Sequence, residues 1–192
     1  VFETSPAAMS ITRYTAKTVV LPVKKYPEVT EDIVFENGDK RVVIGAKSGL
    51  IESYVVHGKE YAEGRLFVPK MYDDTPDPWG MNEPFVGHNP AELTLLEKPD
   101  GVFEGMKSVQ IIEDGEIYLG VEAFFGTGLT RVRLGYKIYK DGSAVDIEAN
   151  VFPNEASKAI KLTLAVGGGT YVGEQVFGKE ELFSDGRECI AQ

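Results

Sequence analysis

The sequence TRVRLGYKIY at positions 130–139 decides the fold class, because polar and apolar residues alternate along it almost without interruption. Such alternation is typical of a β-strand with one face buried and the other in solvent. An Asp-Gly turn follows at 141–142, and residues 144–152 form a second β-rich run. Two such runs joined by Asp-Gly predict a long antiparallel hairpin.

Further β-rich runs stand on both sides of this hairpin. Residues 33–35 and 41–44 flank an Asn-Gly turn, which predicts a second hairpin. Other strands are expected at 50–56, 92–97, 107–113, 116–125, 160–166 and 170–172. The only helical feature expected is a single turn at 154–158. About ten strands with Gly-rich turns predict an all-β domain, a sandwich or barrel, and the long alternating strands favour two large stacked antiparallel sheets.

Length and charge narrow the class of partner. The 192 residues, 43% hydrophobic and 26% charged, suit one globular domain with a sizeable core, or one domain with an appendage. A net charge of -10 makes nucleic acid and anionic membranes unexpected partners, because phosphate binding needs clustered Lys and Arg. A neutral ligand such as a sugar is compatible with an acidic surface.

The single cysteine bears on the cellular compartment of the protein, and the start of the sequence bears on its domain organisation. Cys189 has no partner for an internal disulfide, which fits a reducing compartment, so a cytoplasmic location is expected. The sequence begins at Val1 without an initiator Met, and we expect a domain excised from a longer chain. Residues 1–28 are expected to be an N-terminal edge strand or linker, and residues 29–192 the β-domain.

A proline-rich loop is expected at 70–85, with the sequence KMYDDTPDPWGMNEPF. Its three prolines fix φ and remove backbone donors, so the stretch is predicted to be neither helix interior nor central strand. It holds the only tryptophan beside several carboxylates. An aromatic ring can stack on a sugar and carboxylates can accept its hydroxyl groups, so the candidate carbohydrate-binding residues are Trp79, Tyr72, Asp77 and Asp74. The alternative is that Trp79 caps the core.

Other candidates for chemistry are few. His57 and His88 stand in predicted turns with no His or Cys at zinc-ligand spacing, so no such metal site is predicted. The acidic residues at 73–83 would suit calcium, although without EF-hand spacing, and solvated carboxylates in Asx turns are the alternative. A nucleophilic Cys-His pair would form only if the fold brought a histidine close to Cys189. No catalytic residue is assigned.

Four stretches, in order, resemble the C-terminal β-domain of bacterial-type glycoside hydrolase family 38 α-mannosidases. They are residues 34–53, 72–81, 109–115 and 154–162, and the likeness extends over about residues 30–190. The chain departs from the pattern at Pro153, where relatives often carry tryptophan, and at Ser157, near which they carry histidine.

The resemblance implies a large antiparallel supersandwich like that of galactose mutarotase. It also implies a non-catalytic role, because in that family the zinc ion and the nucleophilic aspartate belong to a separate N-terminal α/β barrel, which nothing in this chain resembles. No cofactor is therefore expected in this chain. The implied partners are that barrel, in the same polypeptide, and an α-mannoside. A role in contacting the barrel predicts an apolar patch on one face.

Two other functions stay open at this point. An autonomous aldose epimerase would need a carboxylate base and a histidine acid facing one sugar ring, with His57 or His88 as the acid. A free-standing carbohydrate-binding module would use Trp79 and Tyr72 as its stacking platform. Whether this chain alone is an enzyme is therefore left open, whereas the parent protein is expected to be an α-mannosidase.

Overall fold

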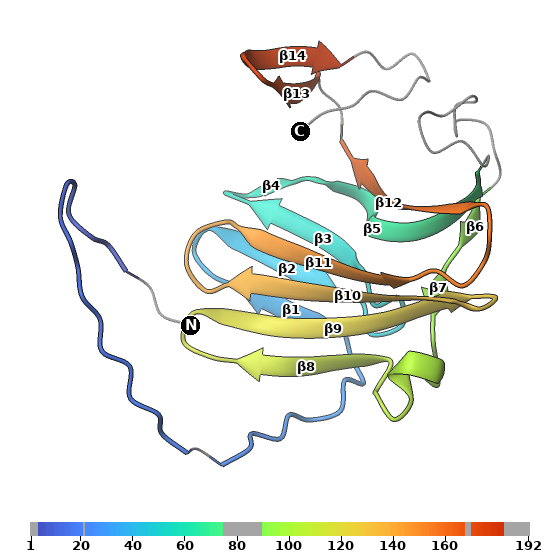
Figure 1. Ribbon diagram of the computed structural model, residues 1–192, viewed down its shortest axis with the longest axis horizontal. Coiled ribbons are helices and arrows are strands. Elements are labelled where there is room, and N and C mark those ends of the chain that lie inside the picture. The colour runs from blue at the N-terminus through green and yellow to red at the C-terminus, as the bar shows by residue number, and fades with distance from the viewer. Residues whose placement is uncertain (1–3, 21, 75–89, 168–169, 183–192) are drawn as a thin grey trace.

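The protein is built from antiparallel β-sheets, as Figure 1 shows for the computed structural model, which describes residues 4–20, 22–74, 90–167 and 170–182. Apart from a 3-10 turn at Gly101–Phe103, these residues contain no helix. Two larger sheets stack face to face, and a separate hairpin follows them in the chain. The predicted all-β class with antiparallel sheets is confirmed. Within the described ranges, no helix is long and apolar enough to cross a membrane.

The first sheet has seven strands in the order β1-β2-β3-β5-β12, with β4 beside β3 and β6 beside β5. Its strands are β1 (Ile33–Glu36), β2 (Lys40–Ile44), β3 (Ile51–Val56), β4 (Lys59–Glu60), β5 (Ala62–Asp73), β6 (Ala91–Glu92) and β12 (Lys158–Val166). β1 and β2 pair across the Asn-Gly turn, which confirms that predicted hairpin. The Asn37 side chain fixes the turn, because its Oδ1 accepts backbone N–H groups of Asp39 and Lys40 at 2.8 and 2.7 Å.

The second sheet has five strands in the order β11-β10-β9-β7, and β8 also pairs with β9. They are β7 (Thr94–Leu95), β8 (Val109–Asp114), β9 (Tyr118–Thr127), β10 (Thr130–Tyr139) and β11 (Val145–Phe152). β10 is the alternating strand from which the fold was inferred, and it pairs with β9 on one edge and β11 on the other. A third, two-stranded sheet joins β13 (Tyr171–Gln175) to β14 (Gly178–Leu182), a strand that was not predicted.

The core lies between the two larger sheets. Along β10 the alternation places Val132, Leu134, Tyr136 and Ile138 inside, each at most 1% exposed. The Tyr136 hydroxyl is satisfied across the core, because it donates a hydrogen bond of 2.8 Å to the Gly49 carbonyl of the facing sheet. Burial raises the pKa of Tyr136 far above its usual value. The phenol therefore remains a neutral donor and links the two layers.

A buried lysine joins the sheets at one end. Lys40 on β2 is only 2% exposed, and its Nζ donates hydrogen bonds to the carbonyls of Tyr139, Gly142 and Ala144 at 2.5, 2.9 and 3.0 Å. Desolvation lowers the pKa of Lys40, although the charges of nearby aspartates partly offset this effect. The turn between β1 and β2 is thus fastened to the turn between β10 and β11.

β5 corrects the prediction for the loop at 70–85. This strand of 12 residues is the longest in the described part of the chain and includes Lys70–Asp73, with β12 on one edge and β3 and β6 on the other. The prediction that the stretch contains no central strand is therefore wrong for Lys70–Asp73. The strand is hard to recognise because Phe67 is an extra, bulged residue at φ 61°, which breaks the alternation, and Pro69 follows it.

The single strand expected at 92–97 is also wrong. Two short strands stand there: β6 pairs with β5 in the first sheet, and β7 pairs with β9 in the second. The chain crosses between the layers at Leu93, which is 1% exposed and donates its backbone N–H to the Pro69 carbonyl at 2.9 Å. A crossing of this kind ends one ladder and starts another.

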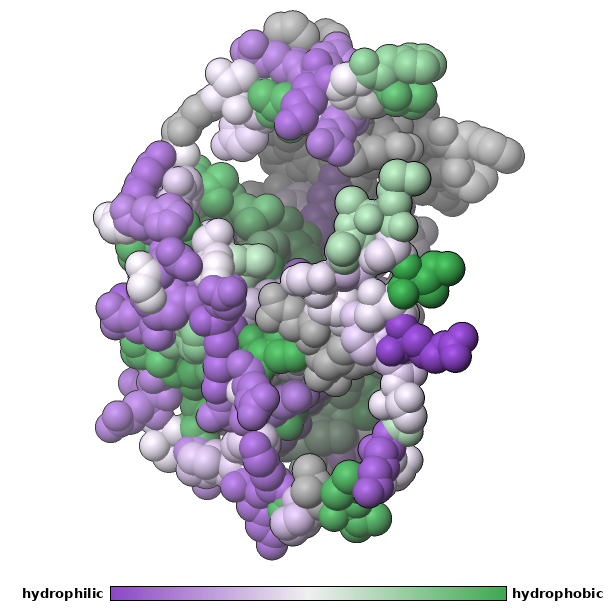
Figure 2. All heavy atoms as spheres, turned by 90° about the vertical axis from the view of Figure 1, so that its left-hand side faces the viewer, coloured by the Kyte–Doolittle hydropathy of each residue, from purple (hydrophilic) through white to green (hydrophobic). Residues whose placement is uncertain are grey.

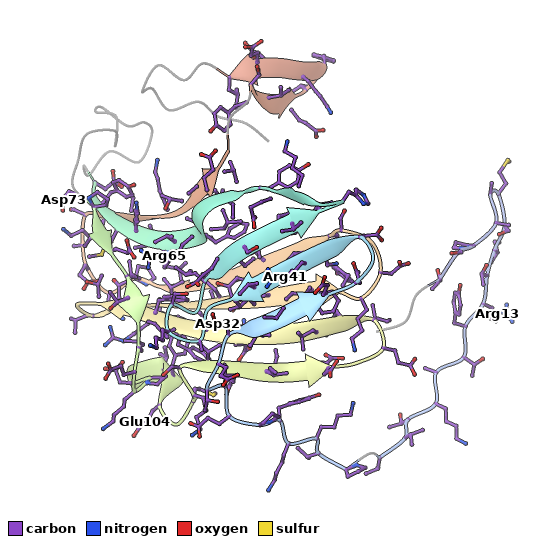
Figure 3. The ribbon with its side chains drawn as sticks, turned by 180° about the vertical axis from the view of Figure 1, so that it is seen from behind. Arg13, Asp32, Arg41, Arg65, Asp73 and Glu104 are labelled. Atoms are coloured by element: carbon purple, nitrogen blue, oxygen red, sulfur yellow. The ribbon has the colours of Figure 1, made fainter. Side chains whose placement is uncertain are left out.

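The N-terminal segment contains no strand in its described part, residues 4–20 and 22–28, so of the two alternatives expected for residues 1–28 the edge strand is not seen there. Figure 3 places Arg13 well away from the sandwich. The segment meets the second sheet near its end, where Tyr26 accepts the backbone N–H of Asp114 at 2.9 Å and Glu28 pairs with Lys107 at 3.1 Å. The domain boundary at residue 28 stays a prediction.

Surface polarity follows the acidic composition. On the face shown in Figure 2, hydrophilic side chains spread over most of the surface, and hydrophobic ones lie between them and in a hollow. This distribution is expected of a chain with a net charge of -10, and the apolar residues between the polar ones are normal for a protein surface.

Candidate functional site

The described part of the predicted sugar site lies at the end of the first sheet where β5 and β12 meet. Tyr72 is half-buried on β5, opposite Ala159 of β12. Asp74 follows the strand directly, and its backbone N–H donates a hydrogen bond of 2.9 Å to the Ser157 carbonyl. The pairing therefore places both residues next to the turn that leads into β12.

An ion pair closes this end of the sheet. Asp73 and Lys158 stand opposite each other in the β5–β12 register, and their side chains form a salt bridge. Figure 3 shows Asp73 at this end of the first sheet. The Asp73 side chain is 80% exposed, so the pair contributes at most about 1 kcal/mol to stability. The backbone ladder between β5 and β12 sets the register, and the ion pair is compatible with it.

The turn before β12 is also fastened to the second sheet. Glu155 Oε1 accepts the backbone N–H of Leu129 at 2.6 Å, and the carboxylate bonds to the Thr130 hydroxyl. Asn154 Nδ2 donates to the Leu129 carbonyl at 2.9 Å. Ser157 then adopts φ 54°, which turns the chain into the strand. Both layers of the sandwich therefore position the end that carries Tyr72 and Asp74.

Four residues considered at the sequence level lie outside the described part of the chain. They are Trp79, Asp77, His88 and Cys189. The structure thus brings together two of the four predicted carbohydrate-binding residues, Tyr72 and Asp74, and the other two stay predictions.

His57 is described, and its surroundings are simple. It occupies the turn between β3 and β4 with its side chain 72% exposed, and its Nδ1 lies 3.8 Å from Asp39 Oδ1. At that distance the groups make a loose, solvated ion pair only when the imidazole is protonated. Among the described residues, the carboxylate that faces His57 is Asp39, whose side chain is itself 45% exposed.

A metal site would need several ligands close together. Within residues 4–20, 22–74, 90–167 and 170–182, no group of three or more His, Cys, Asp or Glu side chains is arranged to hold an ion. The predicted calcium ligands at 73–83 fall mostly outside these ranges, so that prediction remains as it was.

Sequence reasoning missed a groove on the outer face of the second sheet. It is lined by residues of β8–β11, among them Tyr118, Arg133 and Glu148, and has a volume of about 340 Å³. The signal was present in the alternation of β10, whose outward positions include Arg133 and Gly135. At the sequence level these positions predicted only that this side of the strand faces solvent, and no binding role was assigned to them.

Comparison with known proteins adds no relative. No protein-family profile matches the chain, and no curated protein matches it significantly. The likeness to α-mannosidase β-domains therefore rests on the four quoted stretches of sequence alone.

Proposed function

We propose that this chain is the non-catalytic C-terminal β-domain of an α-mannosidase-type glycoside hydrolase, with a supersandwich like that of galactose mutarotase. In the parent enzyme it buttresses a zinc-dependent catalytic barrel of the same polypeptide. Tyr72, Asp74, Asp77 and Trp79 contribute to the rim of the barrel's active site, where an α-mannoside binds.

The observation that carries this proposal is the meeting of two motif segments. The segments 72–81 and 154–162 are far apart in the sequence, yet Asp73 pairs with Lys158 across 85 positions, and Asp74 bonds to Ser157. The described part of the stretch 72–81, residues 72–74, therefore adjoins the stretch 154–162 at one end of the first sheet. Side-by-side placement supports a common local role better than sequence order alone.

An apolar groove fits the expected contact with a barrel. It has a volume of about 210 Å³ and lies over β3, β5, β12 and the start of β11, where its lining includes Tyr61 and Leu164. Tyr61 is 40% exposed and Leu164 50% exposed. Partly exposed apolar residues that gather at one edge of the sandwich support a docking role for that edge.

The proposal is tested with an aryl α-mannoside such as 4-nitrophenyl α-mannoside. The purified chain is expected to release no nitrophenol above the buffer rate, with or without added zinc, because the catalytic aspartate and zinc ligands belong to the barrel. A known α-mannosidase assayed in parallel shows that the substrate is competent. Turnover that co-purifies with the chain would contradict the proposal.

A further inference from the structure

The groove on the outer face of the second sheet has the size and position of a small-ligand site. This sheet is the front layer of Figure 1, so its outer face is turned toward the reader. The volume of about 340 Å³ falls within the range of small-molecule sites. The residues that shape it are Tyr118, Gly120, Arg133, Gly135, Lys137, Asp146 and Glu148.

Two glycines form the floor of the groove. In the β9–β10 register Gly120 stands opposite Lys137, and Gly135 stands opposite Glu122, so the bare positions are close neighbours on adjacent strands. A Cβ added at Gly135 would lie 3.5 Å from the Arg133 guanidinium, which is ordinary contact. Glycine weakens a strand interior, and local packing does not require it at 135. At Gly120, by contrast, an added Cβ would lie 3.2 Å from Ile112 Cγ1 and 3.4 Å from the Tyr118 ring, so packing accounts for that glycine. Gly135 is therefore the position where a side chain would fit but is absent.

One wall is aromatic and held in place. The Tyr118 hydroxyl donates a hydrogen bond to Glu113, and the Tyr118 ring packs edge-to-face on Tyr139 at 6.2 Å between centroids. The Tyr139 hydroxyl donates to Asp146 at 2.6 Å. These bonds to carboxylates raise the pKa of both tyrosines, so both phenols stay protonated at neutral pH. A fixed ring loses little entropy when it contacts the apolar face of a sugar.

The other wall is a preorganised polar network. Arg133 Nε donates to Glu122 Oε1 at 2.7 Å, and its Nη1 donates to Glu148 Oε1 at 3.0 Å and to Asn150. Gln110 holds the second oxygen of Glu122 at 3.1 Å. Burial would lower the pKa of Arg133, but its bonds to the two glutamates outweigh this and raise it. The Glu148 side chain remains 53% exposed, so it is accessible to a ligand hydroxyl.

The charges of the lining indicate the class of ligand. Two cations, Arg133 and Lys137, and two carboxylates, Asp146 and Glu148, line the groove. Two further carboxylates stand behind the walls, because Glu122 bonds to Arg133 and Glu113 accepts from Tyr118, so an anionic ligand is disfavoured. All four carboxylates already have a hydrogen-bond partner, and ligand hydroxyl groups can donate to their remaining lone pairs and accept from the cations. We propose that this groove binds one or two rings of a neutral saccharide, stacked on Tyr118 and hydrogen-bonded to Glu148 and the Arg133 network.

This site is separate from the rim proposed above. The groove belongs to the outer face of the second sheet, whereas Tyr72 and Asp74 belong to the end of the first. The inference does not require that the chain come from an α-mannosidase, so each can fail without the other.

The inference is tested by titrating the ¹⁵N-labelled chain with α-mannobiose and with cellobiose, and with glucosamine and glucuronate as charged probes. We expect at least one neutral disaccharide to bind with a Kd of about 1 mM and to shift amide signals of β9, β10 and β11. Binding of neither disaccharide, shifts confined to other strands, or equally tight binding of the charged sugars would overturn it.

Matched variants assign the binding to the groove. Tyr118→Ala, which removes the ring, and Gly135→Val, which fills the floor, are expected to weaken binding by about tenfold or more. Tyr118→Phe keeps the ring and should stay within about threefold of wild type, as should Gly38→Val, a turn position where an added Cβ meets nothing within 4 Å.

Melting temperatures are recorded for every variant, and the Tyr118 pair decides the outcome if Gly135→Val fails to fold. Tyr72→Ala and Trp79→Ala separate the two sites. Loss of binding in these two variants, with Tyr118→Ala unchanged, would place the sugar at the rim and overturn the groove.

Discussion

Replacing Lys40 by alanine is expected to lower the free energy of unfolding by about 3 kcal/mol, because the variant leaves the carbonyls of the β10–β11 turn without their buried donor. The wild-type ammonium group donates to Tyr139, Gly142 and Ala144, and the side chain is 2% exposed. Unfolding in urea, followed by tryptophan fluorescence and by circular dichroism, measures the change.

Two further variants separate charge from packing at this position. Lys40→Met keeps the length of the aliphatic stem but cannot donate, so it should lose most of the same stability. Lys47→Met removes a lysine that is exposed in the β2–β3 turn and should change stability by no more than about 0.5 kcal/mol. If Lys40→Met were as stable as wild type, the three hydrogen bonds of Lys40 would make no net contribution to stability. The side chain would then join the two turns by packing alone.

Gly49→Ala is expected to cost about 3 kcal/mol, for two additive reasons. Gly49 has φ 67°, a left-handed conformation that costs an L-residue roughly 1–2 kcal/mol. A Cβ there would also lie 2.6 Å from Leu95 Cδ1 and 2.9 Å from Ala123 Cβ, so the core must move, at about 1–3 kcal/mol. Any such movement also disturbs the bond from Tyr136 to the Gly49 carbonyl.

The matched control for this variant is Gly38→Ala. Gly38 also lies in a turn of the first sheet, but it has no positive φ, and an added Cβ would meet nothing within 4 Å. Its unfolding midpoint should therefore stay close to that of wild type. Equal midpoints for the Gly49 and Gly38 variants would mean that the turn before β3 adapts freely, against the close packing described for it.

The sequence predicted those parts of the fold in which a local pattern and the tertiary environment agree. Polar and apolar residues alternate along β10, and the strand has one buried and one solvent-facing side, so the pattern predicted the strand directly. β5 could not be recognised, because the bulge at Phe67 and the proline at 69 interrupt its alternation. In the folded protein β12 pairs with β5 on both sides of this irregularity. The strand expected at 92–97 was divided because Leu93 crosses between sheets, and single-strand patterning carries no information about which sheet a residue joins.

The candidate sites show the same limit. Tyr72 and Asp74 were chosen because aromatic and acidic residues cluster in sequence, and the structure adds their contact with the turn at Ser157. The groove combines Tyr118 from β9, Arg133 from β10 and Glu148 from β11. Each of these residues has no distinguishing pattern within its own strand. Only the antiparallel register brings the three together around Gly120 and Gly135.

The central claim is that this domain belongs to an α-mannosidase-type glycoside hydrolase, and the reading frame upstream of the Val1 codon tests it most directly. The claim predicts that this frame encodes an α/β barrel with histidine and aspartate zinc ligands and a nucleophilic aspartate. An initiation codon directly before Val1, or an upstream domain of another class, would contradict it.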